Sequence, residues 1–276
     1  MPELPEVEIV CRGLAPILEG SFFTEVKLRR ANLRFDFPNN FTKHLTGKKI
    51  YSVRRRAKFI LITLEEDIVL IIHLGMSGTF RVCHSSLSPF QQHEHVIFFT
   101  SNDKQIRYHD PRRFGFMKLT VSSKLKNLPF LAQLGPEPLE PLLNGETLAN
   151  LIKGRKGPIK STLLNQKVIA GIGNIYASEA LNLAGISPKR KTCNLGPLRS
   201  IKLAQAIVKT LNLAIEVGGS TLKDFRKPSG EMGYFQNQFR VYNREGKSCP
   251  NCGHGSSIKK IFQAGRSTFY CSKCQR

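Results

Sequence analysis

Acidic residues are scarce in this sequence, with 20 Asp and Glu against 42 Lys and Arg among 276 residues. The formal net charge is therefore +22, and the isoelectric point is near 10.0. An excess of positive charge on this scale favours a polyanionic partner over a neutral or basic one. Nucleic acid is the first candidate.

Long apolar runs are also missing. The most apolar stretch, 68–72, has the length of a strand and falls far short of the roughly 20 residues that span a bilayer. The N-terminus carries acids where a secretory signal would carry Lys or Arg, so we expect a cytoplasmic protein. The chain has no internal repeat and no low-complexity tract, and its length suggests about two domains.

The distribution of the seven cysteines argues against a disulfide framework. Three are scattered, as expected of reduced thiols, and four form two CxxC pairs near the C-terminus. Each CxxC can direct two thiolates at one ion from a tight turn, so the pairs predict a tetrahedral site for one structural Zn²⁺. Such a site leaves no open position for catalysis, and His254 would be a bystander. The predicted ligands are Cys249, Cys252, Cys271 and Cys274.

The segment around these cysteines, residues 246–276, is too short to build an apolar core, so the metal would hold this zinc ribbon folded. Lys259, Lys260 and Arg266 fall on the hairpin expected between the two pairs. This pattern is typical of a basic finger that contacts phosphates, and equally of a solvated face.

Hydrophobic periodicity predicts an α+β protein with several domains. One amphipathic helix runs from Pro5 to Gly20, and short strands follow it. Several strands with little helix between them predict a β-sandwich that the helix closes off. The clearest predicted strands are 58–64, 68–74, 96–100 and 105–109, the last two joined as a hairpin.

Helical periodicity dominates the second half of the chain, after a proline-rich linker at 134–143. The predicted helices are 148–153, 161–166, 175–184 and 197–217. We therefore predict a catalytic sandwich domain at 1–133, a helical domain at 144–245 that contains an irregular segment at 218–236, and the ribbon at 246–276.

The N-terminus offers a nucleophile. If Met1 is removed, Pro2 becomes a secondary amine close to Glu3 and Glu6. An α-amine titrates near pH 8, so part of it is neutral and can attack an aldehyde-like carbon to form an iminium ion. From these residues alone, an ordinary helix start with acids that suit the helix dipole stays open as an alternative.

Residues 171–174, Gly-Ile-Gly-Asn, lack the later glycine and the preceding strand of a nucleotide-binding loop. We interpret them instead as a tight turn between two helices, whose N–H groups and Asn174 side chain bind phosphate.

A series of motifs resembles the bacterial formamidopyrimidine-DNA glycosylase family from one end of the chain to the other. The motifs are Pro-Glu-Leu-Pro-Glu-Val-Glu at 2–8, Arg-Arg-Ala-Lys at 55–58, His-Leu-Gly-Met-Ser-Gly at 73–78, His-Asp-Pro-Arg-Arg-Phe-Gly at 109–115, Gly-Ile-Gly-Asn-Ile-Tyr-Ala-Ser-Glu at 171–179, Gly-Gly-Ser-Thr-Leu-Lys-Asp-Phe at 218–225 and the cysteine ribbon. The resemblance implies a β-sandwich, a helix–two-turns–helix domain and a zinc ribbon. One small departure is Ala57, where many relatives carry glycine.

The resemblance implies a bifunctional DNA glycosylase/AP lyase of base excision repair, acting on oxidised purines in double-stranded DNA and leaving a one-nucleotide gap with phosphate at both ends. Pro2 would form the Schiff base with the sugar, Glu3 would protonate the ring oxygen, and Glu6 would assist. Lys58 and Arg266 would hold phosphates and assist β- and δ-elimination. One structural zinc is the sole cofactor implied, and the family suggests a monomer.

Chemistry on a base requires the nucleotide to leave the helix, and something must fill its place. By the resemblance, Met76, Arg112 and Phe114 fill this void: Phe114 wedges between bases, and Arg112 hydrogen-bonds the orphaned cytosine. Without the resemblance, Met76 and Phe114 would be interpreted as core residues of strands. Further DNA contacts implied are His73, His93 and Arg155, and the segment 218–236 would cap the extruded base.

Two alternatives stay open. Endonuclease VIII-like relatives share the fold and remove oxidised pyrimidines, but their N-terminus typically reads Pro-Glu-Gly-Pro-Glu. Leu4 and the pair Arg112 and Phe114 therefore favour the purine enzyme. A zinc-ribbon DNA-binding protein without catalysis would fit the charge and the cysteines, yet it would gain nothing from acids beside Pro2.

Overall fold

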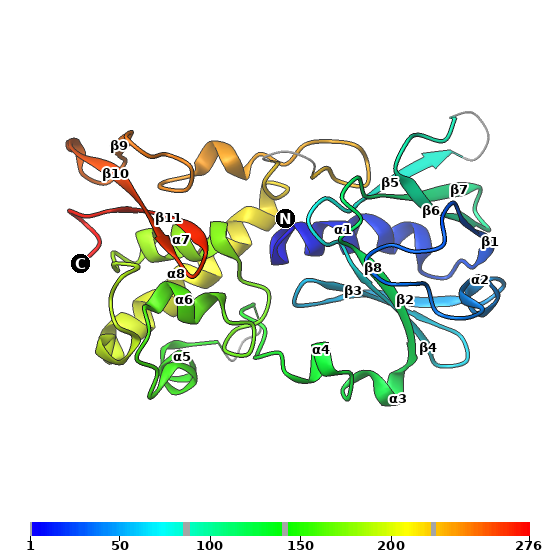
Figure 1. Ribbon diagram of the computed structural model, residues 1–276, viewed down its shortest axis with the longest axis horizontal. Helices are drawn as coiled ribbons and strands as arrows, with labels where there is room; N and C mark the ends of the chain where they lie inside the picture. Colours follow the sequence, from blue (N-terminus) through cyan, green and yellow to red (C-terminus); the bar gives the residue numbers. More distant parts are fainter. Residues whose placement is uncertain (1, 85–88, 140–142, 222–224) are drawn as a thin grey trace. The chain divides into compact units, whose positions relative to one another are not determined.

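The computed structural model describes residues 2–84, 89–139, 143–221 and 225–276 (Figure 1). The chain forms two compact units. The first, the sandwich unit, extends to Ala132 and includes Val217–Tyr234. The second, the helical unit, comprises Gln133–Glu216 and Phe235–Arg276. Part of the segment predicted inside the helical domain thus packs with the sandwich.

Two antiparallel four-stranded sheets form the body of the sandwich unit, with strand orders β1-β6-β7-β5 and β2-β3-β4-β8. The strands are β1 (Phe23–Leu28), β2 (Ile50–Arg56), β3 (Phe59–Leu64), β4 (Ile68–His73), β5 (Thr79–His84), β6 (Glu94–Thr100), β7 (Lys104–His109) and β8 (Phe116–Val121). The predicted strands 58–64 and 68–74 are β3 and β4, and the predicted hairpin is β6 with β7. The sandwich prediction is therefore confirmed.

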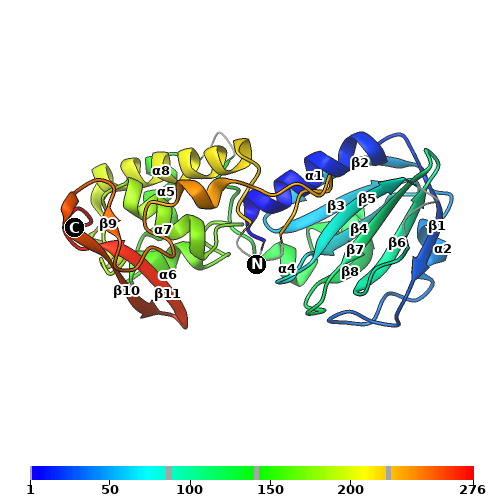
Figure 2. The same cartoon turned by 90° about the horizontal axis from the view of Figure 1, so that it is seen from above.

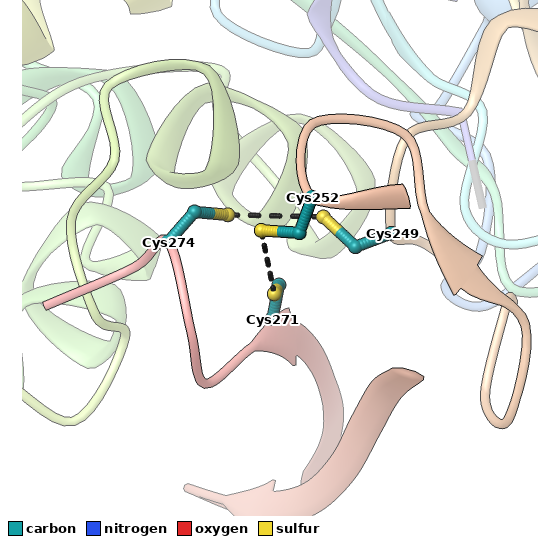
Figure 3. A group of neighbouring side chains, drawn as sticks. All are labelled: Cys249, Cys252, Cys271 and Cys274. Carbon is teal, nitrogen blue, oxygen red and sulfur yellow. Dashed lines mark hydrogen bonds between the residues drawn. The ribbon is translucent and has the colours of Figure 1, made fainter. Parts of the chain in front are cut away.

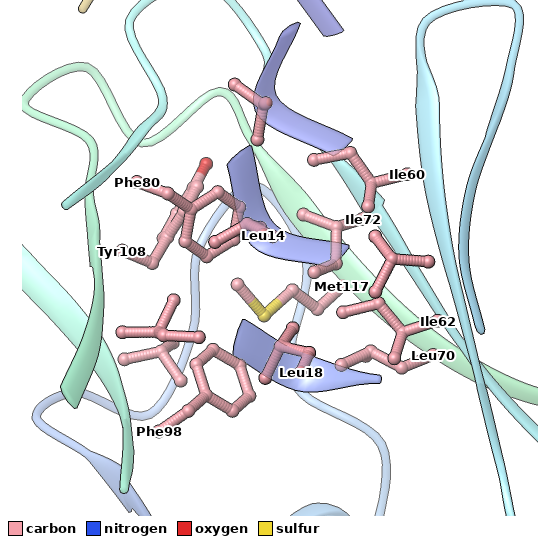
Figure 4. Close-up of a cluster of buried hydrophobic side chains, with 14 of the residues drawn as sticks. Leu14, Leu18, Ile60, Ile62, Leu70, Ile72, Phe80, Phe98, Tyr108 and Met117 are labelled. Atoms are coloured by element: carbon pink, nitrogen blue, oxygen red, sulfur yellow. The ribbon is translucent and has the colours of Figure 1, made fainter. Parts of the chain in front are cut away.

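Helix α1 (Leu4–Leu18) supplies the third face of the sandwich core. Its apolar residues recur at helical spacing, so one stripe is buried and faces both sheets. Figure 4 shows Leu14 and Leu18 between Ile72 of one sheet and Phe80 and Phe98 of the other. Burial of each such side chain contributes about 1.5–3 kcal/mol, so the sheets and the N-terminal helix stabilise one another.

Three short helices accompany the sandwich: α2 (Phe41–Leu45), α3 (Ser122–Leu125) and α4 (Pro129–Ala132). The sequence did not predict them, because one turn or so of helix is too short to show a periodic apolar pattern.

The helical unit contains α5 (Gly145–Ile152), α6 (Ile159–Leu164), α7 (Asn174–Leu183), α8 (Gly196–Glu216) and the 3₁₀ helices η1 (Thr192–Asn194) and η2 (Phe235–Gln238). The four predicted helices are confirmed with small shifts of their ends. Helix α8 packs against α5 and α7, while α7 contacts α6 and the ribbon strand β11 (Figure 2). Among the described residues, no helix combines the length and the apolar character needed to cross a membrane.

The beginning of the predicted linker is anchored in the helical unit. The Gly135 N–H donates to the Gln166 carbonyl at 2.8 Å, and the Ala170 N–H donates to the Pro136 carbonyl at 3.0 Å. Residues 140–142 of this segment lie outside the described residues, as do residues 222–224 of the predicted capping segment.

The ribbon is a three-stranded antiparallel sheet made of β9 (Ser248–Cys249), β10 (Gly253–Gln263) and β11 (Arg266–Cys271). A tight loop joins β10 to β11, where Ala264 and Gly265 both have positive φ, of 48° and 71°. This geometry matches the twist of the two strands. The small core around the ribbon consists of Val241, Cys249, Ile258, Phe269 and Cys271.

Candidate active site and nucleic-acid interface

The N-terminus is fixed by a capping box at the start of α1. The Glu3 side chain accepts a hydrogen bond from the Glu6 N–H, and the Glu6 carboxylate accepts one from the Glu3 N–H at 2.8 Å. Both side chains are buried, at 3 % and 2 % exposure, and Pro2 is buried as well. Chain ends usually fray. Here two predicted catalytic carboxyls hold the residues next to Pro2 in place.

The second oxygen of Glu6 reaches a distant segment of the sandwich unit: Glu6 Oε1 accepts from the Ser220 N–H at 2.9 Å. Gly219 has φ +77°, and a Cβ there would lie 3.2 Å from Glu6 Oε1 and 3.0 Å from Ile9 Cδ1. A side chain at this position would therefore be strained and crowded. The buried Ser220 hydroxyl has no hydrogen-bond partner among the described residues.

Lys58 lies in the tight loop between β2 and β3, directly after Ala57, whose φ is +52°. Arg55 secures this loop, because it donates to the Ala57 carbonyl at 3.2 Å and to Glu8 at 2.9 Å. Burial would raise the pKa of Glu8, but hydrogen bonds from Arg12 and Arg55 outweigh it and lower that pKa. The half-buried Lys58 is thus presented on a loop tied to α1.

His73 ends β4 within an aromatic cluster. Its ring stacks on Phe116 at 5.3 Å between centroids and lies 5.0 Å from Phe59. Burial, together with the charges of Lys58 and Arg34, lowers the pKa of His73 to about 4. The imidazole is therefore neutral at neutral pH. Because its Nδ1 accepts the Gly75 N–H at 3.0 Å, its proton lies on Nε2, which can donate to an acceptor such as phosphate.

The three predicted void-filling residues lie in loops. Met76 is half-buried between β4 and β5, while Arg112 and Phe114 are exposed between β7 and β8. Phe114 is 43 % exposed, and the Arg112 guanidinium lies 4.9 Å from its ring centroid. The alternative interpretation of Met76 and Phe114 as strand core residues is therefore wrong.

His93 also has left-handed backbone geometry, with φ +68°. Its ring lies near two other imidazoles, 6.1 Å from that of His95 and 5.9 Å from that of His109. Burial lowers the pKa of His95, whose Nε2 is hydrogen-bonded to the Asp110 carbonyl at 2.9 Å. His93 is thus held on the sandwich unit at the start of β6.

In the helical unit, Asn174 begins α7 and contacts the ribbon hairpin. Its side-chain N–H donates to the Ser267 carbonyl at 2.9 Å. The fully buried Lys160 donates to Asn174 Oδ1 at 2.5 Å and to Thr268 Oγ1 at 2.7 Å. The structure thus brings Asn174 beside the strand that begins with the exposed Arg266.

Arg155 lies in the loop that follows α5, where its Nε donates to the Leu151 carbonyl at 3.2 Å. The side chain is exposed, as are those of Lys153 and Lys156. This loop presents a basic surface, which suits phosphate contacts.

The four predicted metal ligands converge (Figure 3). Their sulfur atoms lie within 4.8 Å of one another, and all four cysteines are free of disulfides. Cys249 Sγ lies 3.7 Å from Cys274 Sγ, and Cys252 Sγ lies 3.8 Å from Cys271 Sγ. A tetrahedral ion with metal–sulfur bonds of about 2.3 Å separates its ligands by about 3.8 Å. The cluster therefore fits such an ion, and His254 is not part of it.

Sequence reasoning missed several buried polar residues that support these sites. Glu179 accepts hydrogen bonds from the N–H groups of Arg240, Val241 and Tyr242 at 2.7–3.0 Å, which fixes the chain before the ribbon. Burial raises the pKa of Glu179, although these hydrogen bonds oppose the change. The position of Glu179 at the end of the 171–179 motif was the one sequence signal that could have indicated this role.

The sequence matches two family models. The formamidopyrimidine-DNA glycosylase N-terminal domain covers residues 1–117, and the formamidopyrimidine-DNA glycosylase H2TH domain covers residues 134–226. Together they span most of the chain.

Relatives and solved structures agree with this match. The chain is 49 % identical to the formamidopyrimidine-DNA glycosylase of Beijerinckia indica and 46 % identical to that of a Ruegeria species, with 100 % of both chains covered in each case. Its fold is similar to a Lactococcus lactis Fpg mutant in complex with DNA containing Fapy-dG, with a TM-score of 0.91, 32 % identity and all of both chains covered. It is also similar to Lactococcus lactis Fpg with abasic-site DNA, with a TM-score of 0.90, 33 % identity and 99 % of both chains covered. This chain therefore belongs to the formamidopyrimidine-DNA glycosylase family.

Proposed function

We propose that this protein is a bifunctional DNA glycosylase/AP lyase of base excision repair that removes oxidised purines, 8-oxoguanine and formamidopyrimidines, from double-stranded DNA. The observation that carries this proposal is the N-terminal arrangement, in which two buried carboxyls fix the residues beside Pro2. Related chains bound to Fapy-dG and abasic-site DNA support the substrate class.

The first step needs a free imino terminus, so Met1 is removed. The Pro2 nitrogen attacks C1′ of the extruded nucleotide, the glycosidic bond breaks, and the base leaves with a proton. Glu3 protonates the ring oxygen, the sugar opens, and the Pro2 nitrogen, having lost its own proton, forms an iminium ion with C1′. Glu6 keeps the terminus in place, because its carboxylate accepts hydrogen bonds from the Glu3 and Ser220 N–H groups.

The iminium ion withdraws electrons and makes the neighbouring C–H bonds acidic. Loss of the C2′ proton breaks the C3′–O bond, and loss of the C4′ proton then breaks the C5′–O bond. The result is a one-nucleotide gap with phosphate at both ends, and water releases Pro2. Lys58 and Arg266 hold the flanking phosphates and assist these eliminations as charge-stabilising groups.

Binding combines phosphate contacts with filling of the void. His73, through its Nε2 proton, and His93, Arg155 and Asn174 hold the DNA backbone. Met76, Arg112 and Phe114 replace the extruded nucleotide, and the exposed, guanidinium-covered Phe114 ring supports this role. The segment 218–236 caps the base.

A structural Zn²⁺ in the four-cysteine cluster holds the ribbon folded, and the ion takes no part in the reaction. In the proposed domain organisation, residues 1–133 carry the nucleophile and its two acids, and residues 134–143 connect them to the DNA-binding domain at 144–245. Residues 246–276 form the ribbon, which contributes Arg266. Because its proposed substrate is chromosomal DNA, we propose that the protein acts in the cytoplasm, and the family resemblance suggests that it acts as a monomer.

Borohydride trapping on a duplex with 8-oxoguanine opposite cytosine tests this function. Reduction of the iminium ion should leave the protein covalently joined to the DNA. A form with one extra residue before Pro2 should give no adduct, because its Pro2 nitrogen is then an amide without a reactive lone pair. Pro5→Ala is the matched control, since it alters a proline of the same helix start and leaves the terminus free. Strand cleavage at full rate by the extended form would overturn the proposal.

A further inference from the structure

The two loops that carry the proposed void-filling residues meet at one buried carboxylate. Met76 lies in the loop between β4 and β5, and Arg112 and Phe114 lie in the loop between β7 and β8. Asp110 is the first residue after β7 and is 0 % exposed. A carboxylate is costly to bury unless hydrogen bonds satisfy it, so its contacts indicate why it is there.

Asp110 bonds to both loops at once. Its Oδ1 accepts from the Ser77 hydroxyl at 2.5 Å, and its Oδ2 accepts from the Gly115 N–H at 2.8 Å. Ser77 in turn accepts the Arg112 N–H at 3.1 Å. The Asp110 carboxylate and the Ser77 hydroxyl therefore connect Ser77, which follows Met76, with Arg112 and Gly115 in the other loop.

The loops are also in direct backbone contact. Gly75 has φ +64°, and a Cβ at this position would lie 2.3 Å from the Phe114 carbonyl carbon and 2.4 Å from the Gly115 nitrogen. No side chain fits between them. The two loops must therefore move together or separate completely.

A third segment joins at the backbone of Asp110. The Asp110 N–H donates to the His93 carbonyl at 3.0 Å, and the Asp110 carbonyl accepts from the Arg113 N–H at 3.2 Å and from His95. Among the described residues the carboxylate has one further donor, the hydroxyl of Tyr108 in strand β7 at 3.2 Å, and this hydroxyl lies directly against Gly78 and Gly115, one glycine of each loop. Burial and the Asp110 charge raise the pKa of Tyr108 well above its usual value, so this hydroxyl keeps its proton.

We propose that Asp110 is a positioning residue that couples the two loops, so that Met76 enters the DNA helix together with Arg112 and Phe114 as one rigid unit. This inference rests on the proposed function. It has a specific consequence: loss of the coupling slows extrusion of an intact damaged nucleotide and spares chemistry at a site from which the base is already missing.

Single-turnover kinetics on two duplexes test this inference, one with 8-oxoguanine opposite cytosine and one with a preformed abasic site. Asp110→Asn and Ser77→Ala should slow cleavage at 8-oxoguanine by about tenfold or more relative to the abasic site, as expected when a hydrogen bond to a charged group is lost. Ser101→Ala is the matched control, because it removes a hydroxyl that accepts the Phe22 N–H at 3.3 Å in the turn between β6 and β7, at the opposite end of β7 from Asp110. Its ratio should match that of the wild type.

A double-mutant cycle gives the readout that a merely structural role would not change. The effects of Met76→Ala and Phe114→Ala on cleavage at 8-oxoguanine should be non-additive in the wild-type background and additive in the Ser77→Ala background. Unchanged substrate ratios in Ser77→Ala, or persistent non-additivity, would overturn the coupling. A wild-type protein that forms no borohydride adduct on either duplex would instead overturn the proposed function itself.

Discussion

The sandwich and the ribbon are both β structures, yet they are held together in different ways. Among the described residues, the sandwich core contains 27 buried residues, which come mainly from the two sheets and α1 and include Phe225. The ribbon core contains five among the described residues, and two of these are the predicted metal ligands Cys249 and Cys271. Apolar burial can stabilise the first and cannot stabilise the second, since so small a core does not offset the conformational entropy lost on folding.

This difference in stabilisation matches a difference in where the two regions carry their charged side chains. The sandwich has enough apolar burial to tolerate Asp110, Glu3 and Glu6 in its interior. The ribbon instead exposes Lys259, Lys260 and Arg266, and depends on the cysteine cluster for its shape. A change that removes either source of stability should therefore affect one region and leave the other intact.

Removal of the metal should have the largest effect. Structural zinc contributes about 10–16 kcal/mol in small zinc domains, so a chelator should unfold the ribbon and abolish cleavage of damaged DNA. Hydrogen exchange should show loss of protection in β10 and β11, with β6 and β7 still protected.

Cys252→Ser should reproduce this effect, because three thiolates no longer complete the tetrahedron. Cys193→Ser is the control, since Cys193 is exposed and lies outside the cluster. Retained protection of β10 and β11 in metal-free protein would mean that the ribbon folds on apolar contacts after all.

The second prediction concerns acid sensitivity of the sandwich. His73 has a pKa of about 4 in the folded protein against 6.5 as the ordinary value, so between these pH values the unfolded state binds more protons. The contribution of His73 to the free energy of unfolding should therefore be fully present above pH 6.5. It should fall by up to about 3 kcal/mol as the pH drops toward 4. Urea unfolding at a series of pH values, followed by a signal from β3 and β4, measures this free energy.

His73→Gln should remove this part of the pH dependence, and His44→Gln should not, because His44 is exposed on the surface. The comparison between variants isolates His73 from carboxyls such as Glu8, which titrate at lower pH. An identical pH profile in wild type and His73→Gln would contradict the buried neutral imidazole.

The smallest expected effect comes from a pair of matched substitutions, one in the sandwich and one in the ribbon. Each region has an alanine with left-handed backbone geometry in a hairpin loop: Ala57, with φ +52°, and Ala264, with φ +48°. An L-residue in this conformation costs about 1–2 kcal/mol. Ala57→Gly should raise the stability of the sandwich in urea by about 1 kcal/mol. Ala264→Gly should instead tighten metal binding by about fivefold, since folding of the ribbon and metal binding are one process. A gain in sandwich stability from Ala264→Gly would show that the two regions are not independent.

Much of this architecture was predictable from periodicity, because long amphipathic segments such as α1 and α8 have one stable way to bury their apolar face. The cysteine spacing likewise predicted the cluster in Figure 3. What periodicity could not supply were groups whose environment depends on distant residues. Asp110 is an acid, and acids are usually exposed, so its burial follows only from the packing of two loops.

Two further features lay beyond local reasoning for the same reason. The described parts of the segment 217–234 belong to the sandwich unit, although they are far removed from the rest of it in sequence. Phe114 resembles a core residue by type, and only the fold shows that its ring is exposed. The sequence therefore predicted which side chains could carry the chemistry, whereas their burial and their neighbours followed only from the tertiary structure.

The hydrogen bond between Glu6 and Ser220 can form only late in the synthesis of the chain. The two residues are 214 positions apart, and ribosomes add roughly 5–20 residues per second. For roughly 10–40 seconds after the first helix is made, this bond cannot form. A nascent or prematurely terminated chain that ends before residue 220 therefore carries the proposed nucleophile without the hydrogen bond from Ser220 to Glu6, so the proposed reactive end is among the last features that translation completes.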